Sequence, residues 1–221
     1  MPQQPGKIAE ARFAERHPTS HERMTGLPWD ASYYNGPAPW DIGQAQPAIA
    51  RLASEGRFAG PVLDAGCGSG ENALQLAALG LRVVGFDVAE TALAMAREKA
   101  RKRELPVEVE FVVADAFQLE RLGRRFASVL DSGLFHTFDH DEQPRYAASL
   151  ASVTEHDGTL YLLCFSDKGP DLGPHPVSQK DLRAAFNPGI GWNVIGIEPD
   201  RVGTRFHEHG APAWLATIKR L

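Results

Sequence analysis

The stretch "PVLDAGCGSGENAL", residues 61 to 74, decides the fold. An apolar run that reads as a buried strand passes directly into a helical pattern, and Gly66, Gly68 and Gly70 occupy the turn between them. Glycines let this backbone turn sharply and approach a ligand, while the helix start behind them offers free N–H groups. The fingerprint of nicotinamide and flavin enzymes would require a further glycine where Glu71 stands. The loop therefore predicts a ligand site of another kind.

Around this loop, short β-rich runs alternate with amphipathic helices, a pattern typical of a parallel sheet covered on both faces. The expected strands span residues 61–64, 82–86, 107–113, 127–130 and 159–165. The expected helices span about 45–58, 71–78, 90–102, 115–122 and 142–154, with one more starting near the capping pattern of Ser178 and Asp181. Two β-rich stretches, 192–204 and 212–219, then read as an antiparallel hairpin at the sheet edge. The fold class is α/β, a doubly wound, mostly parallel sheet.

The length of 221 residues suits one domain. We expect a flexible N-terminal extension over 1–27, with weak helical character at 8–15, and a single domain over 28–221. A net charge of -5 gives no attraction for nucleic acid or anionic membrane, so a small molecule is the expected partner. The two cysteines form no disulfide framework, and neither a signal peptide nor a membrane span is visible. A cytoplasmic protein, monomer or homodimer, is expected.

Three carboxylates come at or just after the ends of expected strands: Asp64, Asp87 and Asp115. The carboxyl ends of parallel strands meet at one edge of a sheet, where open α/β folds bind their ligands. A carboxylate beside the glycine loop is unsuited to a pyrophosphate but suits a ligand with an ammonium group. Helix capping or a turn is the structural alternative for each carboxylate taken alone.

Four motifs occur in order: "VLDAGCGSG" (62–70), "VVGFDVAETAL" (83–93), "VVADAF" (112–117) and "FASVLDSGLFHTF" (126–138). Together they resemble the class I S-adenosylmethionine-dependent methyltransferases over roughly residues 60–165. The resemblance implies a Rossmann-like sheet of seven strands in the order 3-2-1-4-5-7-6, S-adenosylmethionine as cofactor and no metal. The residues that it assigns to the cofactor are Asp64, Gly66, Cys67, Gly68, Gly70, Asp87, Val88, Asp115, Ala116, Asp131 and Ser132. An NAD-dependent oxidoreductase and a non-catalytic cofactor-binding module are the alternatives from other classes.

Two further stretches narrow the resemblance. "APWDIGQAQP" (38–47) and "GPHPVSQKDL" (173–182) are similar to segments of the thiopurine, thiol and halide methyltransferases, and with "LDSGLFHTF" they most resemble bacterial methyltransferases of heterocyclic toxins such as hydroxyquinolones. The resemblance implies that Trp40 lies against the cofactor and that residues of about 28–47 form a lid. It also implies transfer to O, N or S of a small, flat, largely apolar acceptor, with thiol, thiopurine or halide methylation as the alternative. The Asn/Asp-Pro-Pro-Tyr/Phe motif of nucleic-acid enzymes is absent.

Aromatic residues flank the expected site and predict an apolar pocket for this acceptor. The candidates are Trp29, Tyr33, Tyr34, Phe135 and Phe165. His136 is a candidate general base, with a structural histidine as the alternative. Asp131 is the other candidate catalytic residue, because its charge would face the cofactor. His207 and His209 lack a defined third ligand and read as a surface turn rather than a metal site.

Overall fold

The computed structural model describes residues 16–170, 172–173 and 175–221. Its centre is a seven-stranded sheet in the order β3-β2-β1-β4-β5-β7-β6, which confirms the predicted order. The first five strands run parallel, and β7 pairs antiparallel with both β5 and β6. The strands are β1 (Val62–Ala65), β2 (Val83–Asp87), β3 (Val109–Val113), β4 (Phe126–Ser132), β5 (Thr154–Phe165), β6 (Trp192–Val202) and β7 (Ala211–Arg220).

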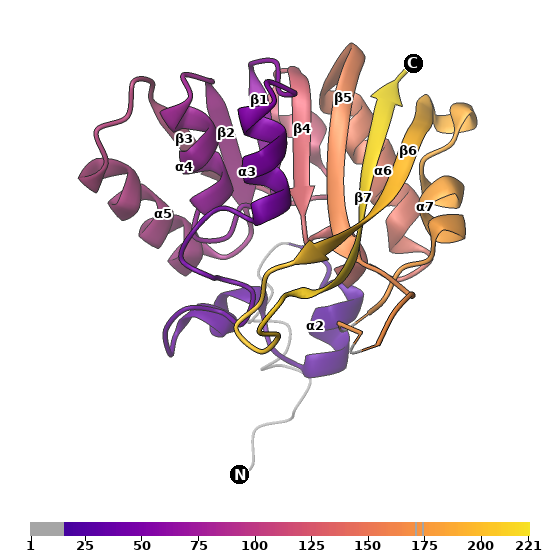
Figure 1. Cartoon of the computed structure of the whole chain (residues 1–221), viewed down its shortest axis with the longest axis horizontal. Coiled ribbons are helices and arrows are strands. Elements are labelled where there is room, and N and C mark those ends of the chain that lie inside the picture. Colours follow the sequence, from indigo (N-terminus) through magenta and orange to yellow (C-terminus); the bar gives the residue numbers. More distant parts are fainter. Residues whose placement is uncertain (1–15, 171, 174) are drawn as a thin grey trace.

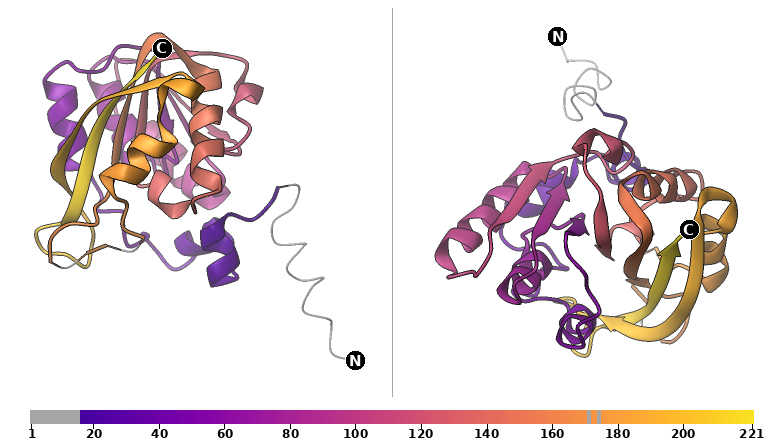
Figure 2. Two further views of the ribbon diagram at one scale, coloured as in Figure 1. Left: turned by 90° about the vertical axis from the view of Figure 1, so that its right-hand side faces the viewer. Right: turned by 90° about the horizontal axis from the view of Figure 1, so that it is seen from above.

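Helices cover both faces of the sheet (Figures 1 and 2). One core holds apolar residues of α3 (Pro47–Ser54), α4 (Glu71–Ala78) and α5 (Glu90–Lys102), among them Ile49, Leu74 and Leu93. The other core holds residues of α6 (Glu142–Val153) and α7 (Gln179–Ala185), together with the short 3-10 turns η2 (Leu119–Leu122), η3 (Phe135–Thr137) and η4 (Pro188–Ile190). Because both faces are buried, the central strands read as continuous apolar runs.

Two elements differ from their predicted form. The predicted helix over 115–122 is a loop that ends in the single 3-10 turn η2, because the Asp115 carboxylate accepts a hydrogen bond from the N–H of Phe117 at 2.9 Å and holds a turn there. Strand β5 begins at Thr154, five residues before the predicted start, directly after α6.

The N-terminal segment forms ordered structure before the domain begins. Helix α2 (Ser20–Thr25) starts at a capping box in which Thr19 and Glu22 exchange hydrogen bonds, and the 3-10 turn η1 (Trp29–Tyr33) follows. Residues 16–27 of the predicted flexible extension therefore include a helix, and the predicted helical character at 8–15 falls outside the described residues. The Ser20 hydroxyl donates to the Glu142 carboxylate at 2.6 Å, which fixes α2 to the start of α6.

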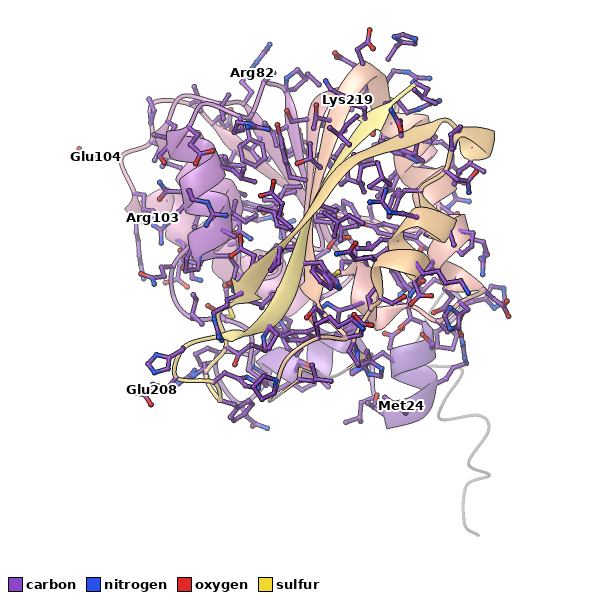
Figure 3. The ribbon with its side chains drawn as sticks, turned by 45° about the vertical axis from the view of Figure 1, so that its right-hand side comes forward. Met24, Arg82, Arg103, Glu104, Glu208 and Lys219 are labelled. Carbon is purple, nitrogen blue, oxygen red and sulfur yellow. The ribbon has the colours of Figure 1, made fainter. Side chains whose placement is uncertain are left out.

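The segment and the β6–β7 turn lie at the same end of the molecule, below the carboxyl ends of the parallel strands (Figure 1). Figure 3 places Met24 of α2 and Glu208 of that turn at this end, and Arg82 and Lys219 at the opposite end. Among the described residues, no helix has both the length and the apolar character that a bilayer crossing needs.

Candidate active site

A cavity of about 360 Å³ opens at the carboxyl edge of the sheet, within the size range of ligand sites. Its walls come from residues 16–46, from the ends of strands β1 to β5 and from the β6–β7 turn. Most of the residues that the sequence singled out line it: Trp29, Tyr33, Trp40, Gly66, Cys67, Gly68, Asp87, Val88, Asp115, Ala116, Ser132, His136 and Phe165.

The glycine loop needs its glycines for two physical reasons. Gly66, Gly68 and Gly70 all have positive φ angles, 65°, 52° and 85°, which L side chains rarely adopt. Space is the second constraint: a Cβ on Gly70 would lie 2.8 Å from the Cβ of Ala96, and one on Gly68 would lie 2.9 Å from the Tyr33 hydroxyl oxygen. Gly70 therefore packs the loop onto α5 and does not line the cavity, whereas Gly66 and Gly68 do.

Asp87 presents its carboxylate to the cavity from the end of β2. It accepts the N–H of Gly68 at 2.8 Å and that of Ala89 at 2.9 Å, so the end of the strand and the glycine loop are held in one arrangement. Burial raises the pKa of Asp87 despite these hydrogen bonds. Asp115 and Ala116 line the same wall from the end of β3. We call Gly66, Cys67, Gly68, Asp87 and Asp115 the glycine side of the cavity.

Asp64 lies beneath the glycine side and is almost fully buried. Its Oδ2 has no hydrogen-bond partner, and burial raises the pKa of Asp64 to about 7, with the Asp131 and Asp87 carboxylates adding to the effect. A buried carboxylate with a free oxygen is costly unless a donor or a cation meets it. Asp64 is not among the residues that line the cavity, but it lies one strand residue from the glycine loop, where a free carboxylate oxygen would suit the ammonium group of a ligand.

Asp131 points into the protein rather than into the cavity. Its carboxylate accepts the N–H of Leu134 at 2.9 Å, the N–H of Phe135 at 3.1 Å and the Tyr146 hydroxyl at 2.9 Å. Burial raises its pKa to about 6. The predicted catalytic carboxylate thus stabilises the turn after β4, because the backbone N–H groups of that turn are its hydrogen-bond donors.

Two of the predicted aromatic residues lie away from the cavity. Phe135 is fully buried in the core, where its ring centroid lies 5.3 Å from that of Phe186. Tyr34 faces solvent with 64% of its surface exposed, since the 3-10 turn η1 directs the preceding Tyr33 inward instead. The 3-10 turn η3 likewise sends Phe135 to the core and its neighbour His136 to the cavity.

Three histidines from distant parts of the sequence meet at the other side of the cavity. His21 stacks on Trp29 with ring centroids 4.2 Å apart, and His175 meets the edge of His21 at 5.7 Å. His136 packs on Phe165 at 4.5 Å. We call these five residues the aromatic side. Sequence reasoning missed His21 and His175, because nothing local marks a histidine in a polar helix or a Pro-rich loop as part of a site.

The His136 ring is neutral. Its pKa is lowered to about 3, chiefly by burial and to a smaller extent by electrostatic interaction with His175 and His21. Its Nδ1 is buried without a hydrogen-bond partner, and the Nδ1 of His21 is in the same situation. Among the residues that the structure describes, no group of three or more His, Cys, Asp or Glu side chains is arranged to hold a metal ion.

Hydrogen bonds hold residues 36–46, which we call the Trp40 loop, against the glycine loop and the β6–β7 turn. The Ser69 hydroxyl donates to the Asp41 carboxylate at 2.6 Å, and the Lys99 ammonium donates to the Ser69 oxygen at 2.7 Å. Gln46 bonds both backbone groups of Gly203, at 2.7 and 3.0 Å. Trp40 donates its indole N–H to the Tyr33 oxygen at 3.3 Å and keeps 38% of its surface exposed. These contacts close one side of the cavity.

Comparison with known proteins agrees with this site. Residues 62–158 match the family model of a methyltransferase domain. A 2-heptyl-1-hydroxyquinolin-4(1H)-one methyltransferase of Mycobacteroides abscessus is 39% identical over 180 residues, 78% of each chain. A probable thiol methyltransferase of Arabidopsis thaliana is 28% identical over 171 residues, 76% of this chain and 75% of that one.

Among solved structures, one from work on "Conversion of a Disulfide Bond into a Thioacetal Group during Echinomycin Biosynthesis" is 36% identical, with a TM-score of 0.74 over 82% of this chain and 84% of that one. The identity to the hydroxyquinolone methyltransferase extends over most of both chains, well beyond the glycine loop. The chain belongs to the S-adenosylmethionine-dependent methyltransferases and is a small-molecule methyltransferase.

Proposed function

We propose that the cavity binds S-adenosylmethionine on its glycine side and transfers the methyl group to an O, N or S atom of a flat, largely apolar molecule on its aromatic side. The observation that carries this proposal is the single cavity in which the glycine loop and Asp87 lie on one side and stacked aromatic rings on the other.

The residues of the glycine side fit the cofactor. Asp87 would bind the ribose hydroxyls, since its carboxylate lines the cavity at the end of β2. Gly66, Cys67 and Gly68 would border the methionine part and the ribose, and Asp115, Ala116 and Val88 the adenine. Asp64, with its free buried oxygen, would attract the ammonium group of the cofactor electrostatically. Trp40 would cover the cofactor from the lid.

The acceptor class follows from the aromatic side and from the relatives. Trp29 and Phe165 offer flat apolar faces, and the neutral rings of His21 and His136 add polar edges without a net charge. Such a pocket suits a heterocycle with one polar group. A hydroxyquinolone or a related phenol is our first candidate, because the relative from Mycobacteroides abscessus is named for such a substrate. A small thiol is the second candidate, because of the plant relative.

The protein's part in the reaction is alignment and exclusion of water. When bound, the cofactor supplies an electrophilic methyl group on a sulfonium. The loop of 36–46 and the β6–β7 turn close over the reacting atoms, and Trp29 and Phe165 orient the acceptor plane. We propose that no metal ion takes part.

Calorimetry and product analysis test this function. We expect the purified protein to bind S-adenosylmethionine and S-adenosylhomocysteine but neither nicotinamide dinucleotide, and to form S-adenosylhomocysteine with a member of a panel of hydroxyquinolones, phenols and thiols. Tight dinucleotide binding without donor binding would support an oxidoreductase. Donor binding with no turnover on any acceptor would support a non-catalytic binding module. Addition of EDTA should leave the rate unchanged.

A further inference from the structure

His136, the candidate general base, lies where it cannot readily hold a proton. The His136 ring is buried, and two further imidazoles, His21 on α2 and His175 before α7, act electrostatically to lower its pKa. Phe165 of β5 packs on its face. Asp131, below the same turn, already accepts hydrogen bonds from Leu134, Phe135 and Tyr146. An imidazolium at this position would have no counter-ion, and the low pKa of His136 agrees with that.

The surroundings of Nδ1 indicate which nitrogen of the His136 ring carries the proton. Nδ1 of His136 is enclosed by protein and has no partner, so an N–H there would be an unsatisfied donor. An efficient base would need the opposite arrangement, with Nδ1–H donating to a carboxylate or a carbonyl and Nε2 free to accept. The favoured neutral ring therefore carries its proton on Nε2. His21 repeats the pattern, with a buried Nδ1 that has no partner.

We propose that the enzyme takes its acceptor as the conjugate base of an acidic hydroxyl or N-hydroxyl group, held by the Nε2–H of neutral His136, and that His136 does not act as a general base. This inference rests on the proposed methyl transfer and specifies its substrate class: flat molecules whose hydroxyl is ionised to a substantial degree near neutral pH. The proton leaves to solvent before binding. A lone pair of the oxyanion forms the O–CH3 bond while the electron pair of the C–S bond passes to sulfur, so no proton moves in the step.

The dependence of kcat/KM on pH has opposite signs for the two mechanisms. If the anion is the substrate, kcat/KM rises about tenfold per pH unit up to the pKa of the acceptor and then levels off. If neutral acceptor reacts with His136 as base, kcat/KM is flat below the acceptor pKa and falls above it, because the base is already unprotonated throughout this range.

The experiment uses ring-substituted 1-hydroxyquinolin-4(1H)-ones in which fluoro and nitro groups lower the hydroxyl pKa. In the wild-type enzyme, we expect the pH at which kcat/KM stops rising to follow the pKa of each acceptor. We expect the same in His136→Gln, which keeps a neutral donor and a rate within about tenfold of wild type, whereas His136→Phe loses about a hundredfold or more. His140→Gln, at an exposed position, is the matched control, and thermal melting checks that each variant is folded.

A second measurement does not depend on turnover. Absorbance of the acceptor bound in the presence of S-adenosylhomocysteine should show the anion at pH values below the pKa of the free acceptor. Three results would overturn the inference. The bound acceptor would show the spectrum of its neutral form, the rise of kcat/KM would occur at the same pH for all acceptors, or kcat/KM would fall above the acceptor pKa. Absence of donor binding, or of acceptor binding and methyl transfer across the series, contradicts the proposed function instead.

Discussion

We propose that donor binding depends most directly on Asp87, since it is the carboxylate of the glycine side that both lines the cavity and holds the loop. Asp87→Asn removes the charge and one acceptor while keeping the shape. We expect the Kd for S-adenosylmethionine to rise at least tenfold, since a hydrogen bond to a charged group contributes roughly 1.5–3 kcal/mol. Titration calorimetry measures it, with Glu198→Gln on the exposed part of β6 as control. An unchanged Kd would contradict the assignment.

Residue identity was easier to predict than residue orientation. The sequence placed Asp131, Phe135 and His136 at one strand end, and the structure agrees on that position. Which of them faces the cavity depends on the 3-10 turn, where consecutive side chains leave in different directions. The backbone N–H groups of the turn then drew Asp131 inward. The site roles assigned to these residues stay predictions.

At the scale of elements, hydrogen bonds fix the Trp40 loop to the glycine loop and to α5, in addition to the apolar contacts of the buried Ala38. Ser69 joins Asp41 to Lys99, and Lys99 also pairs with Glu71 at 2.8 Å. Ser69→Ala removes the hydroxyl that bridges loop and helix, at a cost of about 1 kcal/mol in local stability. We expect faster donor dissociation, measured by stopped-flow fluorescence. Ser54→Ala, on the exposed end of α3, should leave that rate unchanged.

Helix α2 should open in acid because of Glu22. Burial works to raise the pKa of Glu22, but the Arg16 guanidinium and the N–H groups of Thr19 and Trp29 outweigh it, and the pKa is lowered. The stabilisation is therefore complete above the ordinary value of 4.5 and is lost as the pH falls through the lower folded value. The hydrogen-exchange protection factors of residues 16–34, which correct for the intrinsic effect of pH on exchange, should fall in that range.

The matched variant is Glu22→Gln. It leaves an amide in place of the carboxylate beside Arg16, so the protection factors over residues 16–34 should be low already at neutral pH and nearly independent of pH. A wild-type protection pattern in this variant, or one that also changes in α6, would show that Glu22 does not hold the segment.

The elements of the sheet and its helices were predictable because strong periodic patterns and turn residues agree along this part of the chain. The loop after β3 was not predictable in this way. The sequence continues a helical pattern there, but the Asp115 carboxylate accepts the nearby N–H of Phe117 and forms a turn instead. Helix α2 carried a visible signal, Thr19 with Glu22 three residues later. Its apolar periodicity is weak, and its fixed position comes from Glu142, far away in the sequence.

At the scale of the whole molecule, the buried carboxylate Asp64 lowers the stability of the fold when it is ionised, and we propose that its charge serves donor binding. Its folded pKa of about 7 lies above the ordinary 3.8, so the folded state holds the proton more tightly and stability decreases as the pH rises through this interval. We expect Asp64→Asn to raise the Tm at pH 8 but hardly at pH 4, and to weaken donor binding. Scanning calorimetry at the two pH values, with Asp157→Asn on the surface as control, measures the difference. An equal Tm change at both values would contradict it.

The walls of the cavity have a consequence for the order in which the protein becomes competent during synthesis. The glycine loop and the strand ends beside it are made early, whereas Val202, Thr204 and His207 of the β6–β7 turn come some 130 residues later and complete the enclosure. A growing chain on the ribosome therefore contains the glycine loop long before it contains the residues that enclose the cavity. We therefore expect ligand binding only late in folding, after β6 and β7 have joined the sheet.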